Sequence, residues 1–171
     1  MEKNDQAGPL DLLQKTGVDR ERGLKKRLAD LFRTQRLAVL STQDNGQPYS
    51  SLVAFTAPPD LRGLVFATSR STRKFENLTA DPRASLLIDN RSNQAADFQE
   101  AVAVTAVGKV AEVPADLRIN FLNLYLGKHP QLEQFVTAPT SALLQLEVEA
   151  YIIVEQFEKV TQWNPQAGRA D

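Results

Sequence analysis

The sequence predicts a mainly β fold, an antiparallel barrel of six or seven strands with flanking helices. First, short apolar segments follow one another along the chain, and tight-turn residues separate them. Second, the segment from Leu144 to Val154 alternates apolar with polar residues, which is the pattern of a half-buried strand. Third, strands and helices do not alternate regularly, so a doubly wound parallel sheet is not expected.

With 171 residues, the chain is expected to form one domain. Residues 1–22 are polar and contain Gly8 and Pro9, so we expect a flexible N-terminal arm or a short helix there. The domain itself is expected to cover residues 23–165, with residues 166–171 as a tail. It begins with an amphipathic helix, because apolar side chains recur there at helical spacing. These side chains are Leu24, Leu28, Leu31 and Phe32.

Strands and turns follow this helix in order. Asp44-Asn45-Gly46 predicts a hairpin turn between the first two strands, and Pro58-Pro59-Asp60 ends the second strand. Asn90–Gln99 is polar and aperiodic, so it is expected to be a loop, and Gly108 marks a bend or a close backbone approach in a long strand. The expected strands cover residues 37–42, 49–57, 64–68, 84–89, 102–110, 144–154 and 158–163. Helices are expected over residues 71–80, after Pro114 and around residues 132–136.

Composition and charge exclude several classes of function. The 20 Lys and Arg residues nearly balance the 21 Asp and Glu residues, which argues against broad nucleic-acid binding. The absence of cysteine and the single histidine argue against disulfides, thiolate nucleophiles and histidine-based metal sites. The N-terminus lacks a signal-peptide pattern, and no apolar run is long enough to cross a bilayer, so a cytoplasmic protein is expected. If the chain is an enzyme, a bound cofactor is expected to supply the chemistry.

The segment Phe66–Lys74 has the composition of a phosphate-binding site, because hydroxyls and cations stand between a strand and a helix. Cations in the first helical turn, here Arg73 and Lys74, oppose the helix dipole at a cost of about 0.3–1 kcal/mol each. A bound phosphate would offset this cost, since it contacts free helix amides, hydroxyls and cations together. The alternative is that the cations point into water and pair with Glu76 or Asp81.

Four segments occur in a particular order along the chain: Gly46-Gln47-Pro48-Tyr49, Thr68–Lys74, Asn77–Leu87 and Val107–Glu112. Together they resemble the FMN-binding split barrel of the pyridoxamine 5′-phosphate oxidase-like superfamily. The resemblance extends over roughly Leu24 to Val154. Its most specific part is the Arg-Lys pair followed by Asp-Pro-Arg-Ala-Ser-Leu.

The resemblance implies FMN bound at a homodimer interface, with each site lined by both chains. It implies that Arg73 and Lys74 hold the phosphate, with hydroxyl residues close by, and that residues 50–53 pass along the flavin. Asn90 is either a ligand of the polar edge of the ring or part of a solvated loop. Trp163 either covers the benzenoid edge or is a partly buried structural aromatic. The candidate cofactor-binding residues are Ser50, Ser51, Leu52, Val53, Thr68, Ser69, Thr72, Arg73, Lys74, Asn90 and Trp163.

The chain departs from the vitamin B6 oxidases at the positions that hold their substrate. Those enzymes have a Lys at the position of Thr56 and, around the later helix, an Arg and a Ser where this chain has His129 and Glu133. They also have an Arg at the position of Ser51, so one cation for the FMN phosphate is missing here. The C-terminal segment 162–169 also lacks their Arg-x-His pair. Each lost charged contact costs about 1.5–3 kcal/mol, so the pattern implies poor binding of pyridoxamine phosphate. We interpret His129, which precedes a proline, as a turn or cap residue rather than a catalytic acid or base.

The sequence therefore predicts an FMN-dependent oxidoreductase that exchanges electrons with a small donor or acceptor, its substrate left open. No residue stands out as a general acid or base. The alternative is a non-catalytic carrier or sensor of flavin or haem, with haem less favoured because the chain has one histidine. A third hypothesis, an interaction protein using the basic helix face Lys25–Arg33, is disfavoured by the overall charge.

Overall fold

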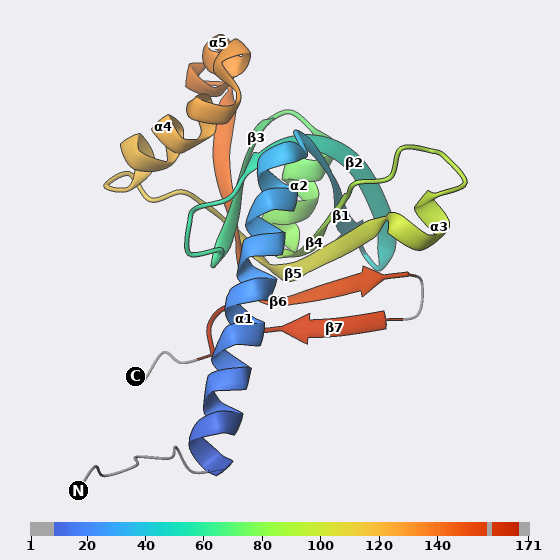
Figure 1. Cartoon of the computed structure of the whole chain (residues 1–171). Helices are drawn as coiled ribbons and strands as arrows, with labels where there is room; N and C mark the ends of the chain where they lie inside the picture. Colours follow the sequence, from blue (N-terminus) through green and yellow to red (C-terminus); the bar gives the residue numbers. More distant parts are fainter. Residues whose placement is uncertain (1–8, 157–158, 168–171) are drawn as a thin grey trace, which may run out of the picture.

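The computed structural model describes residues 9–156 and 159–167, and its centre is one antiparallel sheet rolled into a barrel. The strand order is β3-β2-β1-β4-β5-β6-β7, and a further pairing of β3 with β6 closes six strands into the barrel, with β7 added outside it (Figure 1). This confirms the predicted mainly β barrel. The strands are β1 (Leu37–Asp44), β2 (Gln47–Thr56), β3 (Gly63–Ser69), β4 (Arg83–Asp89), β5 (Val102–Glu112), β6 (Ser141–Glu155) and β7 (Lys159–Trp163).

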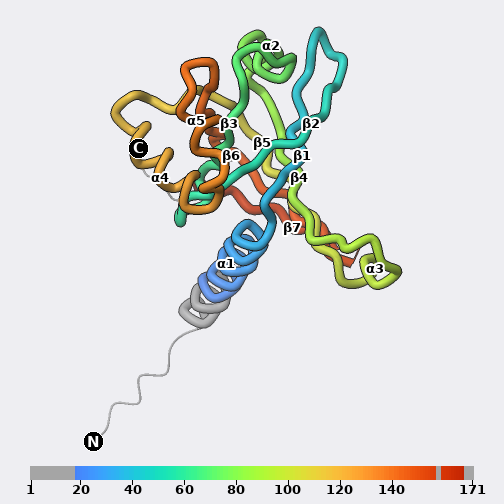
Figure 2. Tube along the Cα trace, turned by 90° about the horizontal axis from the view of Figure 1, so that it is seen from above, coloured from blue at the N-terminus to red at the C-terminus, as the bar shows by residue number. Residues whose placement is uncertain are grey.

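The helices lie at the ends and on the outside of this barrel. Figure 2 shows α1 and α2 on opposite sides of the strands, with α1 projecting beyond them. None of the helices in the described ranges is long and apolar enough to cross a membrane. The helical segments are α1 (Pro9–Thr34), α2 (Arg73–Ala80), α3 (Asp97–Glu100), α4 (Arg118–Lys128), the 3-10 turn η1 (Pro130–Leu132) and α5 (Glu133–Thr137).

The first helix is longer than the sequence indicated. It was expected to start at Leu24, but α1 begins at Pro9 and runs for 26 residues. Residues 9–22, assigned above to a flexible arm or a short helix, are therefore the first half of one continuous helix. The reason is that the polar residues of this stretch permit helix although they offer little to bury, and the apolar half of α1 that follows is anchored on the barrel. Residues 1–8 of the expected arm lie outside the described residues.

The hairpin turn between β1 and β2 follows from two residues. Asn45 and Gly46 have φ angles of 49° and 87°, and Asp44 pairs with Gln47 directly across the turn. Two consecutive positive φ values define the tight two-residue turn whose twist matches that of the strands, and Asn-Gly is the sequence that adopts it most readily. The predicted turn is confirmed.

The core fills the barrel and extends onto the inner face of α1. Alternate residues of each strand point inward, and Leu28 and Phe32 of α1 are 2% exposed against them. A smaller cluster lies outside the barrel, where Tyr125 of α4 and Val136 of α5 cover the outward side of β3 and of the first part of β6. Outward residues in the middle of the remaining strands, such as Val39, Leu87 and Thr105, are only partly buried.

Gly108 allows a close approach of β5 to β6. The register shifts there, because Val107 pairs with Ala150 and Gly108 with Val148, so the strand pair contains a bulge. A Cβ atom on Gly108 would stand 1.9 Å from the carbonyl oxygen of Glu147. The interpretation of this glycine as a point of close backbone approach is confirmed.

Candidate functional site at the N-terminus of α2

The predicted junction between a strand and a helix forms at the N-terminus of α2. Strand β3 ends at Ser69, and α2 begins at Arg73 after the extended N-cap residue Thr72, which has φ −96° and ψ 149°. The Thr72 hydroxyl accepts a hydrogen bond from the amide of Phe75 at 3.4 Å. This cap satisfies one amide of the first turn and leaves earlier amides free to meet an anion.

Hydroxyl groups surround this helix start. The Oγ1 atoms of Thr68 and Thr72 lie 3.0 Å apart, and Thr72 also donates to the carbonyl oxygen of Ser69 at 2.8 Å. The hydroxyls of Ser69 and Ser71 lie 2.9 Å apart. Thr68 is buried, so its position is fixed by the barrel, whereas Ser71 is exposed. The structure thus brings Thr68, Ser69 and Thr72 together, as predicted.

The cations of this segment differ in how they are paired. Arg70 forms a hydrogen-bonded ion pair with Glu112 and lies 5.4 Å from the ring centre of Phe75. Its hydrogen bond with Glu112 raises the pKa of the Arg70 guanidinium. Arg70 is therefore already engaged, and it is a poor substitute for the phosphate-binding Arg that the family has at the position of Ser51.

Arg73 and Lys74 are not paired as the alternative interpretation required. The guanidinium of Arg73 lies 4.9 Å from the ring centre of Tyr49, and its nearest carboxylate oxygen, on Asp44, is 4.0 Å away. Lys74 makes no ion pair or side-chain hydrogen bond within the described part of the chain. Neither cation pairs with Glu76 or Asp81, so both are available to an anion at the start of α2.

Asp81 is held by other groups. It accepts hydrogen bonds from Arg83 and, at 2.5 Å, from the Nε2 atom of Gln43. The bonds from Arg83 keep the pKa of the Asp81 carboxyl far below its ordinary value. These contacts fix the end of α2 on β1 and β4, and so they fix the direction in which the helix N-terminus points.

The four candidate residues of β2 divide between its two faces. Ser50 and Leu52 point outward, and Leu52 is 62% exposed. Val53 points into the barrel, and so does Ser51 on the same face. The Ser51 hydroxyl is buried and has no hydrogen-bond partner in the described part of the chain. Only Ser50 and Leu52 can therefore offer side chains to a ring that lies along the outer face.

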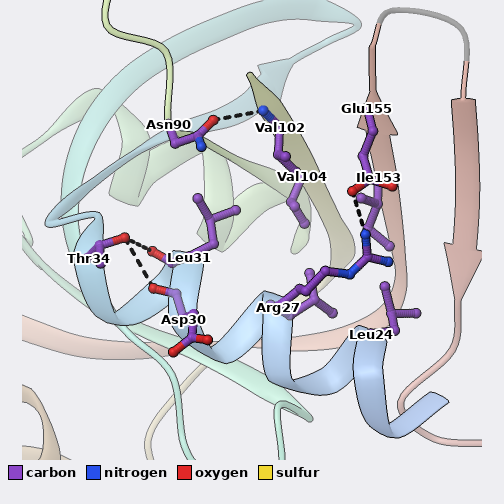
Figure 3. Close-up of a pocket in the computed structure, with 11 residues that line it drawn as sticks. Leu24, Arg27, Asp30, Leu31, Thr34, Asn90, Val102, Val104, Ile153 and Glu155 are labelled. Carbon is purple, nitrogen blue, oxygen red and sulfur yellow. Dashed lines mark hydrogen bonds and ion pairs between the residues drawn. The ribbon is translucent and has the colours of Figure 1, made fainter. Parts of the chain in front are cut away.

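Asn90 and Trp163 lie away from the α2 cluster of the same chain. The side-chain oxygen of Asn90 accepts a hydrogen bond from the Val102 amide at 2.7 Å. It lines a pocket of about 320 Å³ between α1 and strands β4, β5 and β6 (Figure 3). Trp163 stacks on Tyr151 with ring centres 5.6 Å apart, and the ammonium of Lys25 lies 5.4 Å from its ring. Within one chain, Trp163 is thus a structural aromatic at the α1 side.

The pocket in Figure 3 is apolar inside and charged at its rim. Leu24 and Leu31 of α1 face Val104 and Ile153 of the barrel across it, and an ion pair of 2.5 Å joins Arg27 to Glu155. This pair fastens α1 to the end of β6. The pocket brings together no set of groups that would perform acid–base chemistry.

His129 has a structural position. It follows the last residue of α4, is 1% exposed, and its Nε2 atom lies 2.8 Å from the carbonyl oxygen of Phe55. Burial lowers the pKa of its imidazole. The interpretation as a cap residue at a helix break agrees with this geometry. Across the described residues, no group of three or more potential metal ligands occurs.

Sequence reasoning missed an uncharged outer face of the sheet. Paired residues form two rows across β2, β1, β4, β5 and β6, and none of them carries a charge. The signal was present in the sequence, because the outward positions in the middle of these strands are small or apolar, whereas charged residues such as Arg83 and Lys109 stand at the strand ends. The rows are Leu52, Val39, Leu87, Thr105 and Ile152, and Ser50, Ser41, Ser85, Val107 and Ala150.

The barrel, its capped α2 junction and the order of its segments define a protein of the split-barrel class. Residues 24–155 match the family model described as Pyridoxamine 5′-phosphate oxidase, and the chain belongs to this family. A comparison with curated protein sequences finds no match.

Solved structures of several proteins share the fold. A haem-binding protein from Mycobacterium smegmatis superposes with a TM-score of 0.74 at 18% identity over 84% of this chain, which spans 58% of that protein's length. HutZ, a haem storage protein from Vibrio cholerae, has a TM-score of 0.64 at 18% identity, covering 74% of this chain and 90% of that one. A FAD-binding protein from Mesorhizobium loti has a TM-score of 0.60 at 15% identity, covering 75% and 90%.

Proposed function

We propose that this protein binds FMN, with the phosphate at the N-terminus of α2, and acts as a flavin-dependent oxidoreductase. The observation that carries the proposal is the pair Arg73 and Lys74, which stands beside the hydroxyls of Thr68 and Thr72. Its only ion pair among the described residues is the exposed 4.0 Å contact of Arg73 with Asp44. Two such cations at a helix N-terminus are unfavourable until an anion joins them. These residues fit a phosphate monoester in charge and in donor type.

The flavin ring would lie along the outer side of β2. Ser50 and Leu52 point to that side, and the neighbouring outward residues Ser41 and Val39 are small or apolar. Such a surface can be covered by an aromatic ring without burying an unpaired charge. The charged groups that hold the substrate phosphate in the vitamin B6 oxidases are absent, so we propose a substrate other than pyridoxamine phosphate.

We also propose that two chains form the functional unit. The two uncharged rows cross five strands, and their residues are exposed or only partly buried in the single chain. Soluble proteins seldom leave a large uncharged sheet face in water, because burying it is favourable by about 25 cal/mol per Å². A second copy placed on this face would also cover the outer side of β2 and enclose the proposed flavin site.

FMN, when bound, would supply reversible acceptance and return of electrons. Arg73 and Lys74 would bind the phosphate, Thr72 would keep the helix amides directed at it, and the barrel would shield one side of the ring from water. The buried His129 is engaged with Phe55 and is not offered as a proton donor. A proton taken up on reduction of the flavin would come from solvent, since none of the described residues is proposed as its donor.

The test is titration of the purified protein with FMN, followed by flavin fluorescence and by the melting temperature. The double variant Arg73→Gln/Lys74→Gln should weaken FMN binding at least tenfold, because two charge-assisted bonds are lost. Arg70→Gln is the matched control and should change the affinity less than twofold, since Arg70 already pairs with Glu112.

Riboflavin, which lacks the phosphate, separates phosphate binding from ring binding. Riboflavin should bind the wild type more weakly than FMN does. Its affinity for the double variant should equal its affinity for the wild type. The proposal fails if FMN neither changes its fluorescence nor raises the melting temperature, or if the double variant binds FMN like the wild type. FAD serves as a second probe, because it carries the same ring.

A haem carrier is the second candidate, favoured by the structural likeness to the haem-binding and haem storage proteins. The single histidine weighs against it, because His129 is buried and hydrogen-bonded to the main chain. The absorption spectrum of the purified protein, alone and after addition of haemin, decides between the two. A sharp Soret band that persists on gel filtration favours haem, and flavin bands near their usual wavelengths favour FMN.

A further inference from the structure

A groove with an unbalanced positive charge lies between α1, the β2–β3 loop and α4. Its volume is about 620 Å³, within the usual range for small-molecule sites. Three cations line it, Arg33, Arg36 and Lys128, and none of the described residues that line it is acidic. Its other walls are mostly apolar. They include Phe32, Ala57, Pro58, Pro59, Leu61 and Leu124.

Lys128 is held in this groove by contacts that leave part of its ammonium group free. Its Nζ atom donates to the carbonyl oxygen of Phe32 at 2.6 Å and lies 4.0 Å from the ring centre of Phe55. An ammonium has three donors, so at least one remains for a further acceptor. No carboxylate pairs with it among the described residues. Burial and the charge of Arg36 lower the pKa of Lys128 to about 8.

The two arginines add charge with little compensation. Arg36 is exposed and its guanidinium makes no ion pair or hydrogen bond within the described ranges. Arg33 has one carboxylate neighbour, Asp30, at 3.4 Å in an exposed pair. The charges of Lys128 and Arg36 also act on His129, whose imidazole pKa they depress further. The positive charges of this groove therefore lower the pKa values of both Lys128 and His129.

We propose that this groove binds a small organic anion, a carboxylate or a phosphate monoester on a compact apolar body. The anionic group would lie between Lys128 and Arg36, where it completes the donors of both cations. The apolar body would contact Leu61, Leu124 and the prolines of the β2–β3 loop. The groove lies away from the proposed phosphate position of the flavin: Tyr49, next to Arg73, and Thr56, in the groove, stand seven residues apart on β2, roughly 23 Å of extended strand.

The experiment is isothermal titration of the full-length protein with phenyl phosphate, benzoate and the neutral analogue benzyl alcohol. Phenyl phosphate and benzoate should bind, and benzyl alcohol should bind at least tenfold more weakly. Arg36→Gln should weaken the binding of both anions about tenfold, and it should leave folding unchanged because the Arg36 side chain is exposed. Lys128→Gln should do the same while keeping a donor for the carbonyl of Phe32. Arg22→Gln, elsewhere on α1, is the control and should leave both affinities unchanged.

Three results would overturn the proposal. One is the absence of heat for both anions at millimolar concentration. The second is equal affinity for the anions in wild type and Arg36→Gln. The third is loss of phenyl phosphate binding in Arg73→Gln/Lys74→Gln but not in Arg36→Gln, which would place the anion at α2. Conversely, FMN affinity should be the same in Arg36→Gln and wild type, so failure of the flavin proposal would not affect this one.

Discussion

Asn77 of α2 donates a hydrogen bond from Nδ2 to the Oγ1 atom of Thr42 on β1 across 3.0 Å, and both residues are buried. This bond ties the helix that carries Arg73 and Lys74 to the barrel wall. Thr42 keeps only a longer contact of 3.4 Å to the carbonyl oxygen of Tyr49 when Asn77 is removed. The orientation of the proposed phosphate site therefore depends on this buried pair together with the Asp81 contacts at the end of α2.

Asn77→Ala should lower the free energy of unfolding by about 1–3 kcal/mol, because it breaks a buried hydrogen bond and leaves a polar group poorly paired. It should also weaken FMN binding, since α2 is less firmly held. Thr79→Ala on the exposed side of α2 is the control and should change stability by about 0.5 kcal/mol or less. Urea denaturation measures both; equal stability of Asn77→Ala and wild type would contradict the structural role of the pair.

Gly108→Ala should destabilise the barrel strongly. The added Cβ would meet the Glu147 carbonyl oxygen at 1.9 Å and the Val148 Cα at 3.2 Å, so β5 and β6 must move apart. We expect a loss of about 3 kcal/mol by thermal or urea unfolding. Gly23→Ala provides the contrast, because a Cβ there meets nothing within 4 Å inside a helix, and it should stabilise by about 0.5–1 kcal/mol. The same sign for both substitutions would show that close approach is not the cause.

Lys128 should make stability depend on alkaline pH. Its pKa is about 8 in the folded protein and 10.5 ordinarily, so between these values the unfolded chain holds a proton that the folded chain has lost. The contribution of Lys128 to the free energy of unfolding therefore rises from about pH 8 to 10.5. Below pH 8 the residue is charged in both states, and its burial costs stability. The free energy of unfolding of the wild type minus that of Lys128→Gln, measured from pH 7 to 10, should therefore increase with pH.

Lys26→Gln on the exposed face of α1 is the control for that series. Relative to Lys128→Gln, its free energy of unfolding should increase with pH as that of the wild type does. Tyr125 acts in the opposite direction at higher pH, since burial raises the pKa of its hydroxyl to about 12. Its effect is common to all three proteins and cancels in the difference. A difference that stays flat across the window would show that Lys128 titrates normally.

Leu87→Glu should convert the proposed dimer into monomers. Leu87 lies in the middle of one of the two uncharged rows, between Val39 and Thr105. A charge there would be buried against the second chain of the proposed dimer, at a cost of several kcal/mol. Val160→Glu on β7 lies outside both rows, although Val160 is 63% exposed, and it should remain dimeric. Sedimentation at micromolar concentration measures this; a monomeric wild type would contradict the proposal of a dimer.

Local sequence patterns determined much of this fold. The alternation from Leu144 to Val154 predicted β6, and Asn45-Gly46 predicted the turn between β1 and β2. The helix expected over residues 71–80 forms as α2, which begins two residues later, at Arg73. Each of these features depends on residues that are neighbours in the chain, so the sequence alone carries the information. The family resemblance also located the segment that holds Arg73 and Lys74.

Other features came only from contacts between distant segments. The pairing of β3 with β6 closes the barrel across more than 70 residues, and it decides that Ser51 points inward while Leu52 points outward. It also separates Asn90 and Trp163 from the α2 cluster, although all were candidates for one site. Single-chain composition and spacing do not specify such distances.

The near balance of positive and negative charges in the whole sequence does not describe how those charges are arranged in space. The sequence by itself determined the residue types, the strands and the cationic start of α2. Tertiary structure decided how the charges are paired: it joined Arg70 to Glu112, left Arg73 with one carboxylate contact of 4.0 Å to Asp44, and brought Lys128 of α4 near Arg36, which follows α1. Lys74 has no ion pair among the described residues. The physical reason is that charge pairing depends on distance in the folded chain, and that distance is set by closure of the barrel and by the docking of helices on it.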